Sequence, residues 1–394
     1  MNGFYLNALG MICALGNTLD DIRQRLLKQP QSGVCPTRLY GGKEALSLGV
    51  VNDLPDLPIS DVRFDSRNNK MALGALAQIR DEVDAAIKYY GADRVGVIIG
   101  TSTSGIAESE KAIAYQLQHG DFPPAFHYAQ QELGSPATLL AQILEVDGPV
   151  YVHSSACASG AKALASAARL IQMGICDAVI AGGVDTLSAF VVSGFASLES
   201  VSVARTNPLS INRNGINIGE GAALFLMSRE SAPVALRGWG ETSDGYHVSA
   251  PDPEGKGAKK ALEIALSHAG IECKELDYIN LHGTGTVQND AMESRVVHDL
   301  CGDKTWVSST KPMTGHTLGA AGAIEAGLCW LTMQDNNVDG LLPPHLWDSL
   351  PDPTLPQLRV VREGDCIGRP LRWCLSNSFA FGGANAALVL GRTQ

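Results

Sequence analysis

Residues 154–171 read SSACASGAKALASAARLI, and this stretch decides how the rest of the chain is interpreted. A lone cysteine, Cys157, stands where the apolar run YVHSS ends and an alanine-rich pattern begins. Small residues over several turns favour a helix packed tightly inside a protein, so we predict a helix over about residues 159–173. At its N-terminus, unpaired amides and the positive end of the helix dipole favour a thiolate and can hold a developing oxyanion. A buried structural cysteine is the alternative, and the residues alone leave both interpretations open.

The same pattern occurs a second time in the chain. SACASGAKALASAARL aligns with TGHTLGAAGAIEAGLC, which places Cys157 on His316. Two further pairs of segments match in the same order: GVIIGTSTSG (96–105) with INLHGTGTVQ (279–288), and IAGGVD (180–185) with AFGGAN (380–385). Each match is weak alone, and chance similarity between glycine-rich turns is the alternative explanation.

Together the matches predict two halves of the same topology, residues 1–232 and 233–394. The first half carries the cysteine and the second half carries two histidines, His282 and His316. If the halves pack about a pseudo-twofold axis, equivalent turns face each other. Cys157 and His316 would then approach the same point.

Composition indicates a compact α/β enzyme. Of 394 residues, 45% are hydrophobic and only 18% charged, which excludes a disordered chain. Short β-branched runs that end in small residues alternate with helical patterns, as in α/β folds. The net charge of −11 argues against nucleic acid as the main partner.

Cysteine usage and the N-terminus bear on location. Nine cysteines are scattered without a C-x-x-C pair, so neither a zinc framework nor a disulfide scaffold is indicated, and a reducing cytosol fits best. The first residues lack the positive start and long apolar run of a signal peptide, and later apolar stretches fall short of roughly 18 residues. We therefore predict a cytoplasmic protein without membrane insertion.

Two segments of the second half carry further candidates. His282 in NLHGTGT follows a predicted strand, and SSTKPMTGHTLGAAGAIEA contains Lys311, His316 and Glu325. His316 at a helix start should have a lowered pKa and stay neutral at pH 7. Lys311 can place an ammonium beside the same pocket, and Glu325 can balance its charge. The alternatives are an ordinary turn histidine and a glutamate on an exposed edge.

LSNSFAFGGANAALVL (375–390) is predicted to form a strand, a turn with Phe379 and Phe381, and a second strand. Gly382 and Gly383 would let backbone amides reach a substrate oxygen, and Phe381 could pack against the substrate. Paired glycines between strands are more often a simple hairpin. The chain has no G-x-S-x-G, H-E-x-x-H or G-x-x-x-x-G-K-[ST] motif, so serine hydrolase, zincin and P-loop readings lack support.

The four motifs together resemble the β-ketoacyl-acyl carrier protein synthases of the type I/II group, condensing enzymes of the thiolase superfamily. The resemblance covers nearly the whole chain and rests on SSACASG, NLHGTGT, SSTKPMTGHTLGAAGAIEA and NSFAFGGAN. It implies a thiolase-like five-layered αβαβα fold made of two duplicated halves, which dimerises through the first half.

The resemblance also implies a mechanism. Cys157 would accept an acyl group from acyl carrier protein as a thioester. His282 and His316 would assist the decarboxylation of malonyl carrier protein, and the resulting carbanion would attack the acyl-cysteine. The amides of Cys157 and Phe381 would hold the oxygen of the intermediate. The product would be a 3-oxoacyl thioester two carbons longer.

Supporting roles follow from the same resemblance. Lys311 would organise the site around His316, Glu325 would support the lysine, and Phe381 would gate the pocket. Thr284 and Thr286 would hold the phosphopantetheine arm of the carrier protein, with Thr103 near the floor of the acyl pocket. No metal or nucleotide cofactor is implied.

Carrier docking is assigned to a basic stripe, Arg63, Arg67 and Lys70, spaced for one helical face. Because carrier proteins are acidic, such a stripe could bind one. A solvated helix face is the competing interpretation.

Departures from the family pattern concern the substrate. Fatty acid members usually read C-A-T-S after the nucleophile, where this chain has CASG, and their F-G-F-G-G-T-N is FAFGGAN here. These differences favour an aryl polyene or other type II polyketide pathway over housekeeping fatty acid synthesis. The alternative to an active enzyme is the non-catalytic chain-length partner of a ketosynthase, against which Cys157 argues. A homodimer and a heterodimer with such a partner both remain open.

Overall fold

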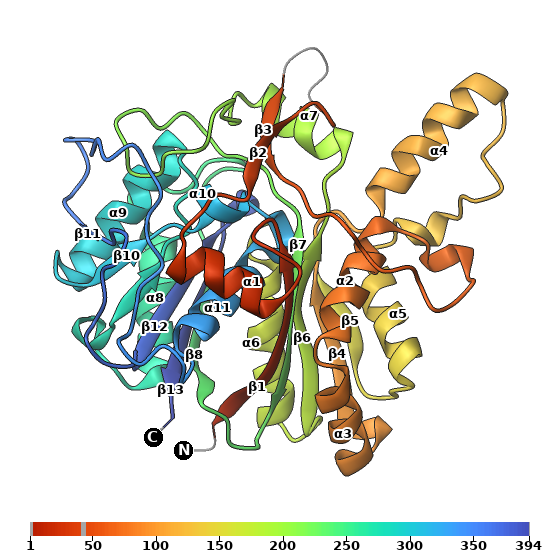
Figure 1. The fold of residues 1–394 in the computed structure, drawn as a ribbon, viewed down its shortest axis with the longest axis horizontal. Helices are drawn as coiled ribbons and strands as arrows, with labels where there is room; N and C mark the ends of the chain where they lie inside the picture. Colours follow the sequence, from red (N-terminus) through yellow and green to blue (C-terminus); the bar gives the residue numbers. More distant parts are fainter. Residues whose placement is uncertain (1–2, 41–44, 394) are drawn as a thin grey trace.

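The structure is a computed structural model that describes residues 3–40 and 45–393 (Figure 1). The first half contains strands β1 (Phe4–Cys13), β2 (Val34–Thr37), β3 (Leu46–Gly49), β4 (Val95–Gly100), β5 (Val150–His153), β6 (Ala178–Asp185) and β7 (Gly221–Ser228). Its helices are α1 (Leu19–Arg23), α2 (Arg67–Ala77), α3 (Arg80–Tyr90), α4 (Ile106–His119), α5 (Ser135–Leu144), α6 (Ser159–Gln172) and α7 (Ala189–Ser197). The predicted helix over residues 159–173 is therefore α6, one residue shorter.

The second half has a similar arrangement of strands and helices, with fewer elements. Its strands are β8 (Val234–Ser243), β9 (Tyr278–Asn280), β10 (Trp306–Ser308), β11 (Arg359–Val360), β12 (Trp373–Phe379) and β13 (Ala384–Arg392). Its helices are α8 (Lys256–Ala269), α9 (Val287–Cys301), α10 (Lys311–Thr314) and α11 (Ala321–Thr332).

Strand order reveals the duplication. In the first half the order is β5-β4-β6-β7-β1, and in the second it is β10-β9-β12-β13-β8, with β11 added at the edge. The strand directions also agree. In the first half β4 runs parallel to β5 and β6, and in the second half β9 runs parallel to β10 and β12. The remaining pairs, β6-β7-β1 and β12-β13-β8, are antiparallel. The two sheets join where β1 pairs with β8. The boundary at residues 232 and 233 falls in the connection between β7 and β8 and stays a prediction.

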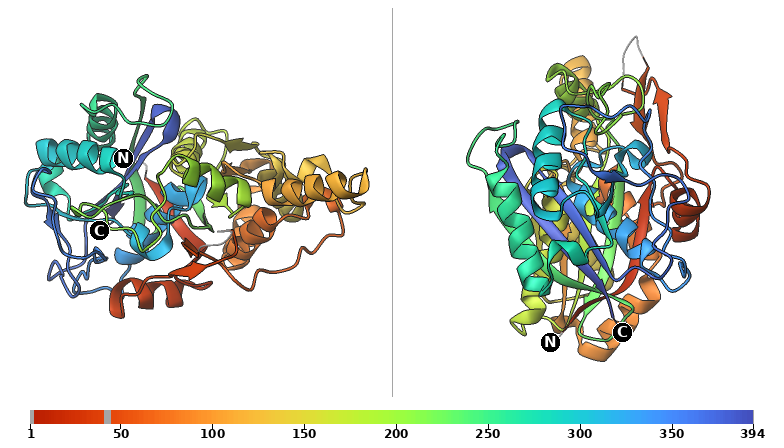
Figure 2. Two further views of the ribbon diagram at one scale, coloured as in Figure 1. Left: turned by 90° about the horizontal axis from the view of Figure 1, so that it is seen from above. Right: turned by 90° about the vertical axis from the view of Figure 1, so that its left-hand side faces the viewer.

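Five layers follow from where each apolar face is buried (Figures 1 and 2). One core packs α6 and α11 between the inner faces of the two sheets. A second core packs α2 and α5 on the outer face of the first sheet, and a third packs α8 and α9 on the outer face of the second. The central helices touch closely, since a Cβ on Gly160 would lie 2.9 Å from the Cβ of Ala323. The predicted thiolase-like αβαβα fold is confirmed.

The match between IAGGVD (180–185) and AFGGAN (380–385) was wrong, because the two glycine pairs occupy different places in their halves. Gly182 and Gly183 lie inside β6, where an added Cβ would meet Ala223 and Ala320, whereas Gly382 and Gly383 form the turn after β12 with φ of 78° and 73°. Both pairs are glycine, but one is required by close packing and the other by left-handed backbone. The two segments match in residue type only, because glycine is needed for a different physical reason in each.

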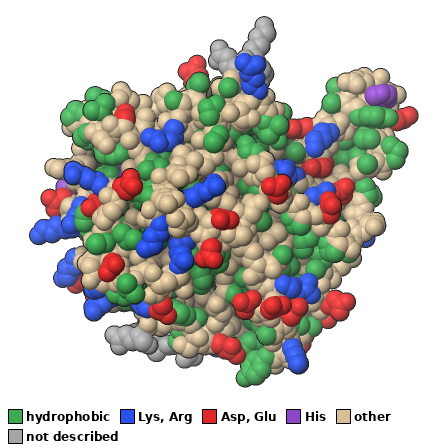
Figure 3. Space-filling model, in the orientation of Figure 1, with side chains coloured by type: hydrophobic (Ala, Val, Ile, Leu, Met, Phe, Trp, Pro, Cys, Tyr) green, Lys and Arg blue, Asp and Glu red, His purple; other side chains and the backbone are tan. Residues whose placement is uncertain are grey.

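Helix α4 extends from the body as an arm (Figures 1 and 2). Hydrophobic side chains gather on this arm in the space-filling view (Figure 3), and large exposed ones on α4 are Ile113, Tyr115 and Leu117. Exposed apolar surface of this kind marks an interaction surface. In the described part of the chain, no helix combines the length and apolar character needed to cross a membrane.

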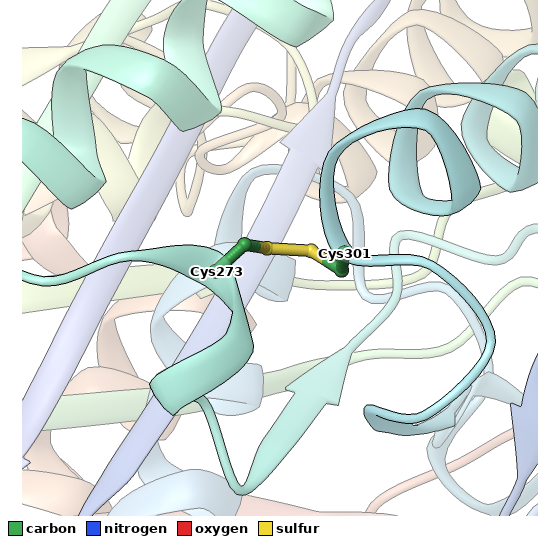
Figure 4. The surroundings of a disulfide bond; sticks show 2 residues. All are labelled: Cys273 and Cys301. Atoms are coloured by element: carbon green, nitrogen blue, oxygen red, sulfur yellow. A yellow bond between two sulfur atoms is a disulfide. The ribbon is translucent and has the colours of Figure 1, made fainter.

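Cys273 and Cys301 form a disulfide that links the start of a 3₁₀ turn to the end of α9 (Figure 4). The sequence had indicated no disulfide, so this is a correction. The two cysteines are separated by 28 residues and meet only because β9 returns α9 alongside the 3₁₀ turn. Spacing along the chain carries no signal of such a pair.

Candidate active site

Cys157 lies at the centre of the molecule, two residues before α6, and is buried. The residue before it, Ala156, has φ of 46°, a left-handed conformation that is strained for alanine and concentrates at functional sites. The Cys157 sulfur lies 3.0 Å from Nε2 of His316. Burial raises the pKa of the thiol to about 12, against the opposing charge of Lys311. The resting group is therefore a thiol, not the thiolate expected from its place at a helix start.

His282 and His316 lie beside this sulfur from the second half. Their rings meet edge to face with centroids 5.3 Å apart. Burial, followed by the charge of Lys311, holds the pKa of both imidazoles well below the usual value. The direction matches the prediction for His316, but the largest cause is burial rather than its place before the 3₁₀ turn Leu318–Ala320 that leads into α11.

Lys311 opens α10 and is fully buried between His282 and Glu325. Its Nζ forms an ion pair with Glu325 and lies 3.4 Å from Nδ1 of His282. Burial raises the pKa of Glu325 to about 7 although the lysine opposes the shift. An ammonium can only donate, so Nδ1 of His282 accepts and its proton stays on Nε2. His282 can therefore donate a hydrogen bond from Nε2.

Two cavities meet at Cys157. The first, of about 200 Å³, is lined by polar and aromatic groups that include His282, His316, Thr284 and Thr286. The second, of about 390 Å³, is mainly apolar, and its lining includes Thr103 together with Ser102, Phe190, Val191, Phe195 and Leu318. Cys157 and Phe381 line both. One sulfur is thus accessible from a polar side and from an apolar side.

Phe381 lines both cavities, and its backbone amide lowers the pKa of the Cys157 thiol, against the larger effect of burial. The predicted amides of Gly382 and Gly383 are already used, since they donate to the carbonyls of Val248 (2.7 Å) and Ala380 (3.1 Å). That part of the prediction was wrong. The two glycines instead supply the left-handed backbone that turns Phe381 toward the sulfur.

The remaining predicted substrate residues lie around the same point. Phe379 lines the first cavity with its ring 6.1 Å from that of His282. The hydroxyls of Thr284 and Thr286 lie 2.9 Å apart at this cavity. Thr103 lines the second cavity, with its hydroxyl bonded to Asp185.

The predicted basic stripe does not form a free surface. Arg63 lies in a 3₁₀ turn before α2 and pairs with an aspartate two residues earlier. Arg67 points inward to the buried carboxylate of Glu220, and Nζ of Lys70 lies 3.0 Å from Asp65. The expectation of one exposed helical face was wrong, because carboxylates distant in sequence or in preceding turns take up these charges.

Sequence reasoning missed Asp185, the last residue of β6. Its fully buried carboxylate accepts bonds from the amides of Ser102 (2.9 Å), Thr103 (2.9 Å) and Gly319 (2.6 Å). The hydroxyls of Thr101, Ser102 and Thr103 also donate to it. One carboxylate thereby ties the turn after β4 to the segment that follows His316 in the other half. A lone acid at the end of an apolar strand was the only signal in the sequence.

Glu293 of α9 was also missed. Its two carboxylate oxygens accept the amides of His282 and Gly283, both at 2.7 Å, and Asn377 donates at 3.1 Å. This buried carboxylate fixes the backbone from which the His282 side chain projects.

Comparisons with known proteins match both halves of the chain to one family. Residues 72–232 match the family described as beta-ketoacyl synthase, N-terminal domain, and residues 234–346 match beta-ketoacyl synthase, C-terminal domain. The 3-oxoacyl-[acyl-carrier-protein] synthase 2 of Synechocystis is 32% identical, over 99% of this chain and 98% of that protein. The enzyme of the same name from Staphylococcus aureus is 30% identical, with the same coverage.

Solved structures give the same result. A ketosynthase from Xenorhabdus doucetiae, solved in complex with its chain length factor, is 45% identical with a TM-score of 0.94, over 100% of this chain and 98% of that one. A beta-ketoacyl synthase from Burkholderia phymatum is 27% identical with a TM-score of 0.87, over the full length of both chains.

Proposed function

The chain belongs to the beta-ketoacyl synthase family of condensing acyltransferases, and from that premise we propose how its own residues carry out the condensation. An acyl group bound to Cys157 is joined to malonyl-acyl carrier protein with loss of CO₂, which gives 3-oxoacyl-acyl carrier protein. The observation that carries the proposal is the meeting of a polar and an apolar cavity at one buried sulfur flanked by two neutral imidazoles.

In the first half-reaction, the Cys157 sulfur attacks the carbonyl of an acyl carrier thioester. His316, at 3.0 Å, accepts the thiol proton as the attack begins, which is required because burial raises the pKa of Cys157 to about 12. The proton then passes to the departing pantetheine thiolate. The amides of Cys157 and Phe381 hold the oxygen of the intermediate. The acyl chain occupies the apolar cavity.

In the second half-reaction, the malonyl thioester enters the polar cavity, where Thr284 and Thr286 hold the phosphopantetheine arm. Decarboxylation leaves an enolate, whose oxygen accepts hydrogen bonds from the imidazoles of His282 and His316. For this step His316 carries its proton on Nε2, the tautomer opposite to the one that accepts the thiol proton in the first half-reaction. Lys311 supports the donor tautomer of His282, and Glu325 balances the lysine charge. The enolate carbon attacks the carbonyl of the acyl-cysteine and forms the new carbon–carbon bond. The tetrahedral intermediate then expels the Cys157 thiolate, which takes up a proton from solvent to restore the resting thiol.

The substrate class is proposed from the lining of the apolar cavity. Three aromatic rings, Phe190, Phe195 and Phe381, face it, and aromatic surfaces suit flat conjugated chains. This lining and the departures CASG and FAFGGAN are the grounds for proposing a specialised polyene or polyketide pathway, aryl polyene synthesis among them. The Xenorhabdus ketosynthase, 45% identical to this chain, was solved with a chain length factor, and such a partner fits a specialised pathway.

The partners proposed are acyl carrier protein and a second chain of the same fold. The apolar arm of α4 and the cavity lined by Phe190, which is 66% exposed, provide the surface for that chain. The Xenorhabdus ketosynthase was solved with a chain length factor, which supports a heterodimer here. Native mass spectrometry of the chain expressed alone and with a chain length factor distinguishes a homodimer from a heterodimer.

The reaction as written needs no metal or nucleotide, since substrates arrive on the phosphopantetheine arm of the carrier protein. A cytoplasmic location is part of the same proposal, although the Cys273–Cys301 disulfide removes cysteine usage as an argument for it. Fractionation of the native cells, with the chain recovered away from the cytosol, would contradict it.

The decisive test is transfer of an acyl group to Cys157. Incubation with acyl carrier thioesters should add one acyl mass to the intact protein, and Cys157→Ala should abolish this addition. Cys35→Ser, which changes an exposed cysteine, is the matched control and should label as wild type. Labelling of Cys157→Ala would refute the nucleophile, and an unlabelled wild type would favour the non-catalytic chain-length partner.

A further inference from the structure

Three side chains of the active site could also bind a metal ion, which the condensation does not require. The sulfur of Cys157 and the ring nitrogens of His282 and His316 lie within 4.8 Å of one another, and all three residues are buried. Thiolate and imidazole are the ligands that Zn²⁺ prefers, and three protein ligands with an open fourth position form a common zinc geometry. The polar cavity beside these atoms provides space for the fourth ligand.

The spacing is close to that of a bound ion. With bonds of about 2.0–2.3 Å, the ligand atoms of a tetrahedral zinc site lie roughly 3.3–3.8 Å apart. Cys157 Sγ and His316 Nε2 are 3.0 Å apart, and the three atoms span at most 4.8 Å. Side-chain movements of about an ångström would complete the geometry.

Lys311 opposes metal binding in two ways. A zinc-bound histidine normally donates its other ring N–H to an acceptor, but Nδ1 of His282 faces the ammonium of Lys311 at 3.4 Å. This contact keeps the proton on Nε2, the nitrogen whose lone pair a cation would need. The ammonium also places a positive charge beside the site, in a buried region where repulsion is weakly screened.

We propose that Cys157, His282 and His316 form a latent site for a soft divalent cation such as Zn²⁺, from which Lys311 excludes the ion. Zinc at this position would hold the sulfur as a metal thiolate and block acyl transfer. Binding forms a Zn–S bond and releases the thiol proton to solvent. Lys311 thereby keeps the nucleophile available in a cell that contains zinc, a role separate from orienting His282 during decarboxylation.

The test compares metal affinity of the purified full chain and of Lys311→Met, measured without any acyl substrate. We expect Lys311→Met to bind one Zn²⁺ per chain on the order of 100-fold more tightly than wild type, the range seen when outer-shell partners of metal ligands change. Co²⁺ should give the variant a thiolate-to-cobalt absorption band, and adding Cys157→Ser should remove it. Lys260→Met, which removes an exposed lysine paired with Glu263, is the matched control and should bind as wild type.

Equal zinc affinity of wild type and Lys311→Met would overturn the proposal, as would a gain that persists in the Cys157→Ser background. Lys311→Met leaves Glu325 buried without its partner, so Lys311→Met with Glu325→Gln is the second variant, and circular dichroism reports its folding. The double variant should keep the gain in affinity. Because no condensation is measured, failure of this proposal and failure of the proposed function are distinguishable.

Discussion

Replacing Asp185 with asparagine should weaken the fold, because one carboxylate holds turns from both halves. Oδ2 is the acceptor for the amide of Gly319, and Oδ1 is an acceptor for the amide of Thr103. An asparagine must present its NH₂ to one of these amides, which leaves a buried donor unsatisfied at about 1–3 kcal/mol. Loss of charge assistance in the remaining bonds adds to this, so we expect Asp185→Asn to lose about 3–5 kcal/mol of stability.

Acyl transfer should fall as well. Gly319 follows His316 by three residues, and the intervening Leu318 has φ of 53°, a strained conformation that the Gly319 bond to Asp185 helps to hold. Release of this segment would let His316 move by about an ångström, which lowers the rate roughly 100-fold. Leu318 also lines the apolar cavity, so the Michaelis constant for long acyl carriers should rise.

Urea denaturation gives the stability, and quenched intact-mass measurements of acyl-enzyme give the rate. Asp177→Asn is the matched control, because that aspartate pairs with Arg94 at a partly exposed position and should cost less than about 1 kcal/mol. An Asp185→Asn protein within 1 kcal/mol of wild type that transfers acyl groups at the wild-type rate would refute the reasoning.

Three further predictions follow from the site and its surroundings. His282→Ala should reduce decarboxylation of malonyl carrier protein by roughly 10²–10³-fold, as when an oxyanion donor is removed, and reduce acyl transfer less; parallel assays of the two partial reactions check this, and equal losses contradict it. Burial lowers the pKa of His345 from 6.5 in the unfolded chain to about 4 in the folded protein. As the pH falls from 6.5 to 4, the unfolded chain is protonated at His345 while the folded protein is not. The free energy of unfolding therefore declines over this range by on the order of 3 kcal/mol. Denaturation at pH 7 and pH 4 should therefore show a smaller loss in His345→Asn than in wild type, and identical losses would exclude this cause. Alkylation of denatured protein should label seven cysteines before reduction and all nine after it, since Cys273 and Cys301 are paired, whereas nine labelled without reductant would mean that the disulfide is absent.

Much of the site follows from local sequence and from the repeat. Helix α6 was predicted within one residue because small residues at helical spacing are a local signal. The meeting of Cys157 and His316 was predicted because a duplicated chain that packs about a pseudo-twofold axis brings equivalent turns together, and the two side chains lie 3.0 Å apart.

Residues that act through long-range contacts gave no such signal. Asp185 and Gly319 are separated by 134 positions, and neither has a local pattern that names the other. Arg67 fits an exposed basic face by spacing, yet it turns inward to Glu220, 153 residues away. Whether such a side chain faces solvent or a distant partner depends on how the layers of the fold pack together.

The sequence by itself determined the alternation of strands and helices, the two similar halves and the chemical identity of the groups at their junction, because periodicity and residue type act over a few residues. Only the tertiary structure decided the protonation state of Cys157, the tautomer of His282 and the carboxylates that hold the loops, because burial and charge act through space. The same sulfur that a helix start would ionise is held as a thiol by burial among the two sheets and central helices.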